Sequence, residues 1–257
     1  MKRALTLLLM CGGLAACETN PVSGRSQFVI VSEQQAQASS TQAYAQTLSA
    51  AEKQGKISRD AALNARVRRI TDRLIDQARA MYPPSRDWKW SVAVIEENQL
   101  NAWCMPGGKM AIYTGLVGKL ALTDDEIAQV MGHEISHALL GHGRERMSRA
   151  MATQLGLQLG SVVAGRDLSV FAPLAEIGIT LPNSREAESE ADRYGMELAA
   201  RAGYDPRAAV RLWEKMGAAS NGGPPQFLST HPSPDNRMAT LRALVPTMQP
   251  LYEAARR

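Results

Sequence analysis

The residues best able to do chemistry are the two histidines and the glutamate between residues 133 and 137, in the order His-Glu-Ile-Ser-His. On an α-helix, side chains four residues apart are offset by about 40°, so His133 and His137 share one face and can reach one metal ion. Glu134 is rotated by about 100° from His133, so its carboxylate can act on water beside the ion without binding it. The motif therefore predicts a site for one zinc ion per chain, with Glu134 as the general base.

Two histidines do not complete a catalytic zinc site, which commonly has three protein ligands and one position for water. In one class of zinc peptidases, glycine and histidine follow the second motif histidine by three and six residues. Here Gly141 and His142 follow His137 by four and five residues, which disfavours that class. We interpret His142 as a helix-end residue or as a support for a ligand.

The acidic stretch from Asn183 to Asp192 supplies the carboxylates. Apolar residues recur at helical spacing through it, which predicts a helix over 184–202. On one flank Glu188 and Asp192 lie one turn apart, followed by small residues that permit another helix to approach. Glu190 lies on the opposite flank. We predict that Glu188 is the third ligand and that Asp192 orients a metal-bound histidine, while Glu190 stays open as the alternative ligand.

Periodicity and turn residues predict the elements that must position these side chains. An alternating segment at 88–95 and a second strand at 109–114 form a small sheet. The motif helix is expected to begin with Asp124 as its N-cap and to end near Leu140. The other helices are expected at 33–51, from 60 to the prolines at 83 and 84, at 144–164, 184–202 and 206–217, and from 235 after a Gly/Pro-rich loop at 217–234. This is an α+β, mostly helical fold.

The first residues have the layout of a secretory signal, with two basic residues ahead of a short apolar stretch. Leu14-Ala15-Ala16-Cys17 resembles a bacterial lipobox, in which the cysteine is acylated and becomes the mature N-terminus. Two or three acyl chains would anchor the chain stably. By resemblance to bacterial lipoproteins, Glu18 after Cys17 favours sorting to the outer membrane. The alternative is a plain cleaved signal with an incidental cysteine.

The chain is therefore expected to divide into a signal at 1–16, a lipidated N-terminus and tether at 17–32, and one domain at 33–257. Within the tether, Phe28–Val31 is expected to form a short docked strand. Since one cysteine leaves with the signal and Cys17 is acylated, Cys104 is expected to be a buried, unpaired thiol.

Composition excludes several classes of protein. With 45% hydrophobic and 21% charged residues, the chain is not mainly disordered. The formal charge of +4 falls to about +2 without the two basic residues of the signal, which gives no reason to expect nucleic acid. No apolar run approaches the roughly 18 residues of a spanning helix, so none is expected.

Four sequence blocks, in this order along the chain, resemble those of the forty-eighth metallopeptidase family. This family belongs to the gluzincins and includes the CAAX prenyl proteases and periplasmic lipoprotein peptidases. The blocks are Asn101-Ala102-Trp103 with Pro106-Gly107-Gly108, the motif at 133–137, Ser184-Arg185 with Glu188-x-x-Ala191-Asp192, and Ser229-Thr230-His231-Pro232 with Arg237. The resemblance covers nearly the whole mature chain. The lipobox and the lack of spanning segments favour the periplasmic branch.

The resemblance also implies roles for residues outside the motif. Asn101, Ala102 and Trp103 would belong to an edge strand that holds an extended substrate by backbone hydrogen bonds. His231 would either face the reacting carbonyl or cap the zinc as a plug. Arg237 would either stabilise the oxyanion or anchor its own helix. Both pairs of alternatives stay open.

Together these features predict a zinc-dependent endopeptidase of the bacterial cell envelope, anchored in the outer membrane and facing the periplasm. Its expected substrates are unfolded or misassembled envelope proteins, with the outer-membrane assembly machinery as a further partner in quality control. The alternative is a chaperone or assembly factor that uses a plugged or weakly proteolytic peptidase fold. A structural zinc protein is a third interpretation.

Overall fold

Helix α5 (Asp124–Leu139) lies at the centre of the fold and carries the His-Glu-x-x-His motif. All but its first two residues are buried. Strand β4 (Ala102–Met105) packs on it, as do helices α3 (Ala61–Met81), α8 (Arg185–Arg201) and α9 (Arg207–Ala218). A helix enclosed by several elements can bury polar side chains together, so the motif is shielded from bulk water on most sides.

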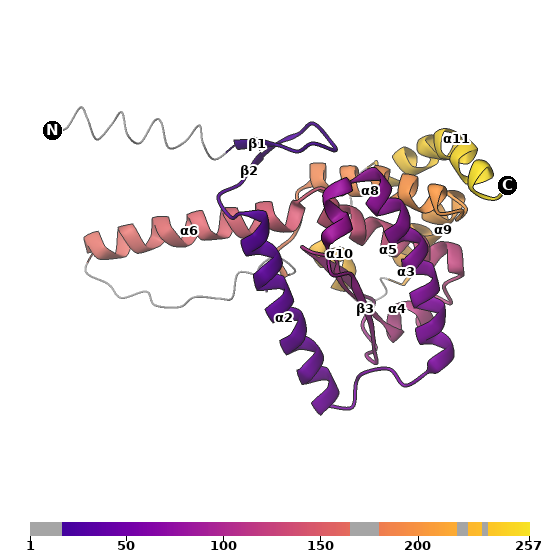
Figure 1. Ribbon diagram of the computed structural model, residues 1–257, viewed down its shortest axis with the longest axis horizontal. Helices are drawn as coiled ribbons and strands as arrows, with labels where there is room; N and C mark the ends of the chain where they lie inside the picture. The colour runs from indigo at the N-terminus through magenta and orange to yellow at the C-terminus, as the bar shows by residue number, and fades with distance from the viewer. Residues whose placement is uncertain (1–16, 165–179, 220–225, 233–235) are drawn as a thin grey trace.

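The computed structural model describes residues 17–164, 180–219, 226–232 and 236–257 (Figure 1). The predicted signal and parts of the loop predicted at 217–234 lie outside these residues. Figure 1 also shows α6 projecting from the body of the molecule. The remaining helices are α2 (Glu33–Lys53), the 3₁₀ helix η1 (Pro83–Asp87), α4 (Thr114–Lys119), α6 (His142–Ala164), α10 (Gln226–Thr230) and α11 (Arg237–Ala255). The predicted α+β, mostly helical fold is confirmed.

Thr123 caps the motif helix, so the expectation that Asp124 would do so was wrong. The Thr123 hydroxyl accepts a hydrogen bond from the Glu126 N–H (3.3 Å), and the Glu126 carboxylate accepts one from the Thr123 N–H (2.8 Å). This reciprocal pair satisfies N–H groups that the helix start leaves free. Asp124 lies in the first turn, where its charge suits the helix dipole, and it pairs with Arg66 and Arg69 of α3.

A three-stranded sheet lies beside α5, in the order β3-β5-β4. Strands β3 (Ser91–Ile95) and β5 (Lys109–Tyr113) run parallel, and β4 runs antiparallel to β5 with Ala102 opposite Ile112. Strand β4 is therefore an edge strand that also packs on the motif helix. The sheet places one strand edge next to the motif. Ala102 and Trp103 belong to this strand, as the resemblance implied, whereas Asn101 lies just before its first residue.

Helices α5 and α8 approach most closely where two glycines meet. A Cβ on Gly195 would lie 2.8 Å from the backbone of His133, and one on Gly132 would lie 2.8 Å from the Gly195 carbonyl oxygen. Real Cβ atoms do not come so close, so only glycine fits at either position. Glu188 lies about two turns before Gly195 on α8. The contact therefore fixes how far Glu188 stands from the motif histidines.

Residues 17–28 form an N-terminal hairpin, in which β1 (Cys17–Thr19) pairs antiparallel with β2 (Ser26–Phe28). The side-chain amides of Asn20 and Gln27 are buried and donate to the Leu140 carbonyl, each over 2.8 Å. That carbonyl closes the last turn of α5, where helix carbonyls otherwise lack partners. The segment predicted to be a tether is thus docked on the end of the motif helix, and Cys17 at its start is exposed.

Some predicted boundaries were wrong. The strand expected at Phe28–Val31 forms earlier, because Ser26–Phe28 pairs with β1 while Val31 turns inward onto Ala36 and Met147. The strand expected from residue 88 begins at Ser91, because Trp88 ends the 3₁₀ helix η1. The short helix α10 lies within the region predicted as a loop. The prediction for Cys104 is confirmed, since its thiol is buried and unpaired.

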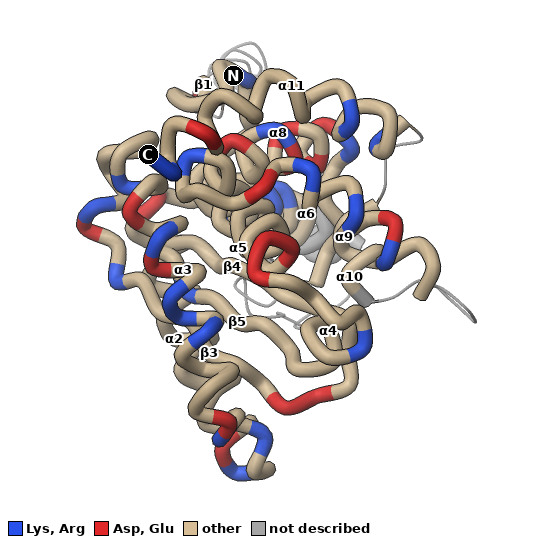
Figure 2. The backbone as a smooth tube through the Cα atoms, turned by 90° about the vertical axis from the view of Figure 1, so that its right-hand side faces the viewer, with Lys and Arg blue, Asp and Glu red and all other residues tan. Residues whose placement is uncertain are grey.

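Acidic and basic residues are interspersed over the described backbone (Figure 2). Some of them join elements, as Lys215 of α9 does by pairing with the buried Glu126 of α5 over 2.7 Å. Among the described helices, none combines the length and apolar character needed to cross a membrane.

We expect Gly195→Ala to lower the free energy of unfolding by about 1–3 kcal/mol, because its methyl group would overlap the α5 backbone. Gly217→Ala in α9 is the matched control, since nothing lies within 4 Å of a Cβ there. That control should cause no loss of stability. Urea unfolding followed by circular dichroism measures both variants. Equal stabilities would contradict the close packing of α5 on α8.

Candidate metal centre

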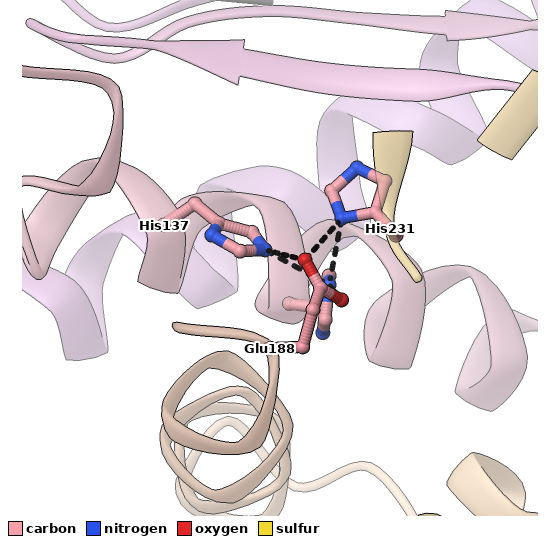
Figure 3. A group of neighbouring side chains, drawn as sticks. His137, Glu188 and His231 are labelled. Carbon is pink, nitrogen blue, oxygen red and sulfur yellow. Dashed lines mark hydrogen bonds and ion pairs between the residues drawn. The ribbon is translucent and has the colours of Figure 1, made fainter. Parts of the chain in front are cut away.

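Four side chains that can bind a metal meet between α5, α8 and the residue that follows α10. His133, His137, Glu188 and His231 each offer one donor atom, and these atoms all lie within 4.8 Å of one another. All four residues are buried. Figure 3 shows His137 and His231 turned towards the Glu188 carboxylate. The structure thus brings together the three predicted ligands and adds His231 to them.

The spacing of the donor atoms fits a zinc ion. His137 Nε2 lies 3.0 Å from His133 Nε2 and 3.3 Å from Oε1 of Glu188, whose Oε2 lies 3.4 Å from His133 Nε2. A tetrahedral zinc ion with ligands at about 2.1 Å holds its donors about 3.4 Å apart. Two imidazoles and one carboxylate are also a donor set of catalytic zinc sites. The residues present therefore fit the predicted metal.

Burial and charge act in opposite directions on the ligands. Burial raises the pKa of Glu188, but the charges of His231 and His137, with hydrogen bonds from His133 and His137, hold that pKa well below its ordinary value. Burial lowers the pKa of His133, whereas hydrogen bonds to Asp192 and Glu188 and their charges raise it to about 9. Glu188 is therefore an ionised carboxylate among imidazoles, ready to bind a cation.

Glu134 lies beside the donor cluster and is only 2% exposed. Its Oε1 is 3.4 Å from Nε2 of His231, the ring nitrogen of His231 that faces away from Glu188. Burial raises the pKa of Glu134, and the charges of His231 and His133 only partly oppose this. A raised pKa makes the carboxylate a stronger base, which suits Glu134 to take a proton from water.

The second ring nitrogens of the motif histidines have their own partners. His133 Nδ1 lies 3.1 Å from the Asp192 carboxylate, which is the role predicted for that residue. His137 Nδ1 lies 2.8 Å from Nδ1 of His142, whose Nε2 is 3.0 Å from the Glu190 carboxylate. Burial raises the pKa of Glu190, but hydrogen bonds, the first of them with His142, lower it to about 2. Glu190 therefore holds His142 and lies outside the donor cluster.

Arg237 connects the two acidic residues of α8. Its Nη2 donates to Glu188 Oε2 over 3.1 Å and to Asp192 Oδ1 over 2.6 Å. Its guanidinium lies 3.4 Å above the centre of the Trp213 ring. This geometry favours the anchoring role over the oxyanion role, because the buried cation is held by carboxylates on the side of the ligands.

A cleft of about 200 Å³ opens onto Glu134, His137 and His231. The segment Asn101–Trp103 lines one side of it, at the start of the edge strand. Backbone groups along such an edge can pair with an extended peptide. A peptide bound along this edge would therefore lie next to the donor cluster and Glu134. Cys17, at the start of the hairpin, is not part of the cluster.

Two residues at the cleft were not predicted. Nδ2 of Asn183 lies 3.3 Å from Nδ1 of His231 and 3.5 Å from Nε2 of His137. Arg146 also lines the cleft, and burial lowers the pKa of its guanidinium to about 10. The sequence did point to Asn183, because it lies just before Ser184, the N-cap of the helix that carries Glu188. Arg146 lies one turn after His142 on α6, a helix whose sequence gave no reason to expect a site.

The motif helix, the buried His-His-Glu set and the neighbouring edge strand define a metallopeptidase of the His-Glu-x-x-His class. Residues 61–245 match peptidase family M48, and the chain belongs to this family. The family predicted from the four sequence blocks is confirmed.

The chain is similar to several curated proteins. It is 31% identical to metalloendopeptidase OMA1 of Bos taurus over 244 residues, which cover 89% of this chain and 46% of that protein. It is 36% identical to mitochondrial metalloendopeptidase OMA1 of Schizosaccharomyces pombe over 167 residues, 63% of this chain and 49% of that protein. It is 30% identical to the beta-barrel assembly-enhancing protease of Escherichia coli O157:H7 over 193 residues, 70% of this chain and 40% of that protein. The chain thus matches half or less of the length of these relatives.

Arg237→Gln should lower the free energy of unfolding by about 3–5 kcal/mol, because two buried carboxylates would lose their cation. Arg242 on the same helix pairs with Glu214 at the surface over 2.9 Å. Arg242→Gln should therefore change the free energy of unfolding by less than about 1 kcal/mol. Urea unfolding of the metal-free protein compares the two variants. A small and equal effect would show that Arg237 does not hold the acids of α8.

Proposed function

We propose that the protein is a zinc-dependent endopeptidase. The observation that carries this proposal is the convergence of His133, His137 and Glu188 beside a cleft that also holds Glu134 and an edge strand. Each part answers a requirement of peptide hydrolysis: a metal position, a base and a surface for an extended backbone. A purely structural zinc site needs neither the base nor the cleft.

The chain's own residues suggest how hydrolysis proceeds. Zinc, when bound by the two motif histidines and Glu188, supplies a Lewis acid that acidifies water and polarises the peptide carbonyl. Glu134 accepts the proton of the attacking water and passes it to the leaving amine. Asp192 and Arg237 hold His133 and Glu188 in orientation. The edge of β4 would align the substrate by backbone hydrogen bonds, so selectivity would depend on extended conformation more than on one side chain.

Glu134→Gln should keep zinc and abolish cleavage, since the amide preserves the shape of the side chain but cannot accept the proton. We expect unchanged zinc content by elemental analysis and a loss of at least about 100-fold in the turnover of an unfolded protein substrate. Metal-dependent cleavage retained by the purified variant would refute Glu134 as the base.

His231 is proposed to act as a cap on the metal in the resting protein. The support is that its Nδ1 lies 3.0 Å from Glu188 Oε1 and 3.3 Å from His133 Nε2, among the donor atoms. A fourth protein donor would occupy the position that water and substrate need. Withdrawal of His231 would then be a condition for cleavage, and the protein would be latent until substrate displaces it.

His231→Ala should therefore raise the basal rate of cleavage several-fold and weaken zinc binding slightly. The double variant with Glu134→Gln is the matched control, and it should be inactive because the exposed metal would still lack its base. Steady-state kinetics on an unfolded protein gives both rates. A fall in kcat with unchanged KM would instead assign His231 to the transition state.

We further propose that the protein works in the bacterial cell envelope, attached to the outer membrane through Cys17 and facing the periplasm. The support is the lipobox-like sequence before Cys17, the exposure of that cysteine, and the similarity to a relative named as a beta-barrel assembly-enhancing protease. Other relatives are named as mitochondrial, so this location rests mainly on the N-terminal sequence. Misassembled envelope proteins and the assembly machinery are the proposed partners.

The alternative function is a chaperone or assembly factor that uses the plugged fold for binding. The position of His231 among the donor atoms is the observation that favours it. Expression of the Glu134→Gln variant in a strain that lacks the native gene separates the two functions. Full rescue of envelope defects would support the binding role, whereas failure to rescue would support proteolysis.

A further inference from the structure

We propose that Arg25 in the N-terminal hairpin positions the metal ligand His137, acting through Glu190 and His142. The inference rests on the proposed function in one respect, because it requires a metal at His137. The residues matched to the family begin at residue 61, so the hairpin precedes the matched region. The hairpin would thus support a metal ligand although it lies outside the region that matches the family.

A continuous series of short contacts connects the hairpin to the ligand. Arg25 Nε lies 2.8 Å from Oε2 of Glu190. The same oxygen lies 3.0 Å from Nε2 of His142, and Nδ1 of His142 lies 2.8 Å from Nδ1 of His137. The Nε2 atom of His137 is its donor atom in the cluster. Each contact is within ordinary hydrogen-bond length, so none needs a bridging water.

The polarity of these hydrogen bonds is consistent from one end to the other. Arg25 can only donate, so the Glu190 carboxylate accepts from it and from Nε2–H of His142. Nδ1 of a neutral His142 then lacks a proton and accepts from Nδ1–H of His137. That assignment leaves Nε2 of His137 with a free lone pair, which is the form that binds a metal. The series thus selects the tautomer that a ligand needs.

Arg25 is itself held in place. Its Nη2 pairs with the Glu145 carboxylate over 2.7 Å, and Glu145 is 5% exposed on α6. On α8, the hydroxyl of Tyr194 donates to the Val22 carbonyl of the hairpin over 2.9 Å. The amides of Asn20 and Gln27 secure the hairpin to the end of α5, as described above. The guanidinium is therefore fixed relative to α5, α6 and α8.

The hairpin that contains Arg25 also contains Cys17, the proposed site of the lipid anchor. Cys17 pairs with Phe28 at the open end of the same hairpin. If Cys17 carries the lipid, the part of the chain nearest the membrane is also the part that supports His137. Undocking of the hairpin would remove Arg25 from Glu190 and loosen a ligand without touching the cleft.

The test compares zinc binding by the full chain and by Arg25→Gln, purified under the same conditions. Competition with a chromophoric chelator gives the zinc Kd, and the visible spectrum of the cobalt(II)-loaded protein reports ligand geometry. We expect Arg25→Gln to raise the zinc Kd about tenfold and to change the cobalt bands, as loss of a partner behind a ligating histidine does. Arg25→Lys should recover only part of the affinity, because lysine lacks the planar fork that reaches both Glu190 and Glu145.

Glu18→Gln is the matched control. It removes another ion pair of the hairpin, with Arg144 over 2.9 Å, that has no contact with His142. Its zinc Kd and cobalt spectrum should equal those of the unmodified chain. Since Glu190 lies in the same series, Glu190→Gln should add little to the effect of Arg25→Gln in the double variant.

Zinc binding by the unmodified chain with an unchanged Kd and spectrum for Arg25→Gln would overturn this inference and leave the proposed function intact. Failure of the unmodified chain to bind zinc would overturn both. An Arg25→Gln variant that unfolds more easily without metal, but shows the native cobalt spectrum when loaded, would also overturn the inference, because the hairpin would then act on stability alone.

Discussion

The close approach of α5 and α8 is the constraint on which the rest of the site depends. Two glycines meet at the crossing, and neither has room for a Cβ. Glu188 lies about two turns before Gly195 on α8, and His133 follows Gly132 on α5. Because both helices are rigid, this single contact sets the distance from Glu188 to His133 and His137. A wider separation would leave the histidines as a pair without an acid. The ligand set therefore depends on the close packing of the two helix backbones as well as on the ligands themselves.

Around that crossing, buried charge is balanced by direct contact. Glu188 and Asp192 share Arg237, whose guanidinium rests on Trp213, and the same acids face the motif histidines. Burying several ionisable groups is costly unless each has a partner. Here the partners lie on α11 and α5, so the last helix of the chain contributes to the same arrangement as the motif helix. The pKa of Glu188 is held well below its ordinary value by the histidines around it, which suits this acid to hold a cation.

The two motif histidines are supported in different ways. His133 has a carboxylate directly behind it, while His137 has a second imidazole whose far nitrogen meets Glu190. The first support comes from Asp192 of α8, which Arg237 of α11 holds in turn, and the second extends to the N-terminal hairpin.

The sequence by itself determined what depends on neighbours along the chain: the pairing of His133 with His137, the position of Glu134 and most of the helices. It also favoured Glu188 over Glu190, because i, i+4 spacing with Asp192 is local. Only the tertiary structure decided that His231 joins the donor atoms, that Arg237 holds the acids and that residues 17–28 are docked. These features unite segments separated by tens of residues, and periodicity carries no information about which side chains meet across such distances. The N-cap was misplaced because threonine and aspartate both suit that position. In the structure Thr123 caps the helix, and Asp124 pairs with Arg66 and Arg69 of α3.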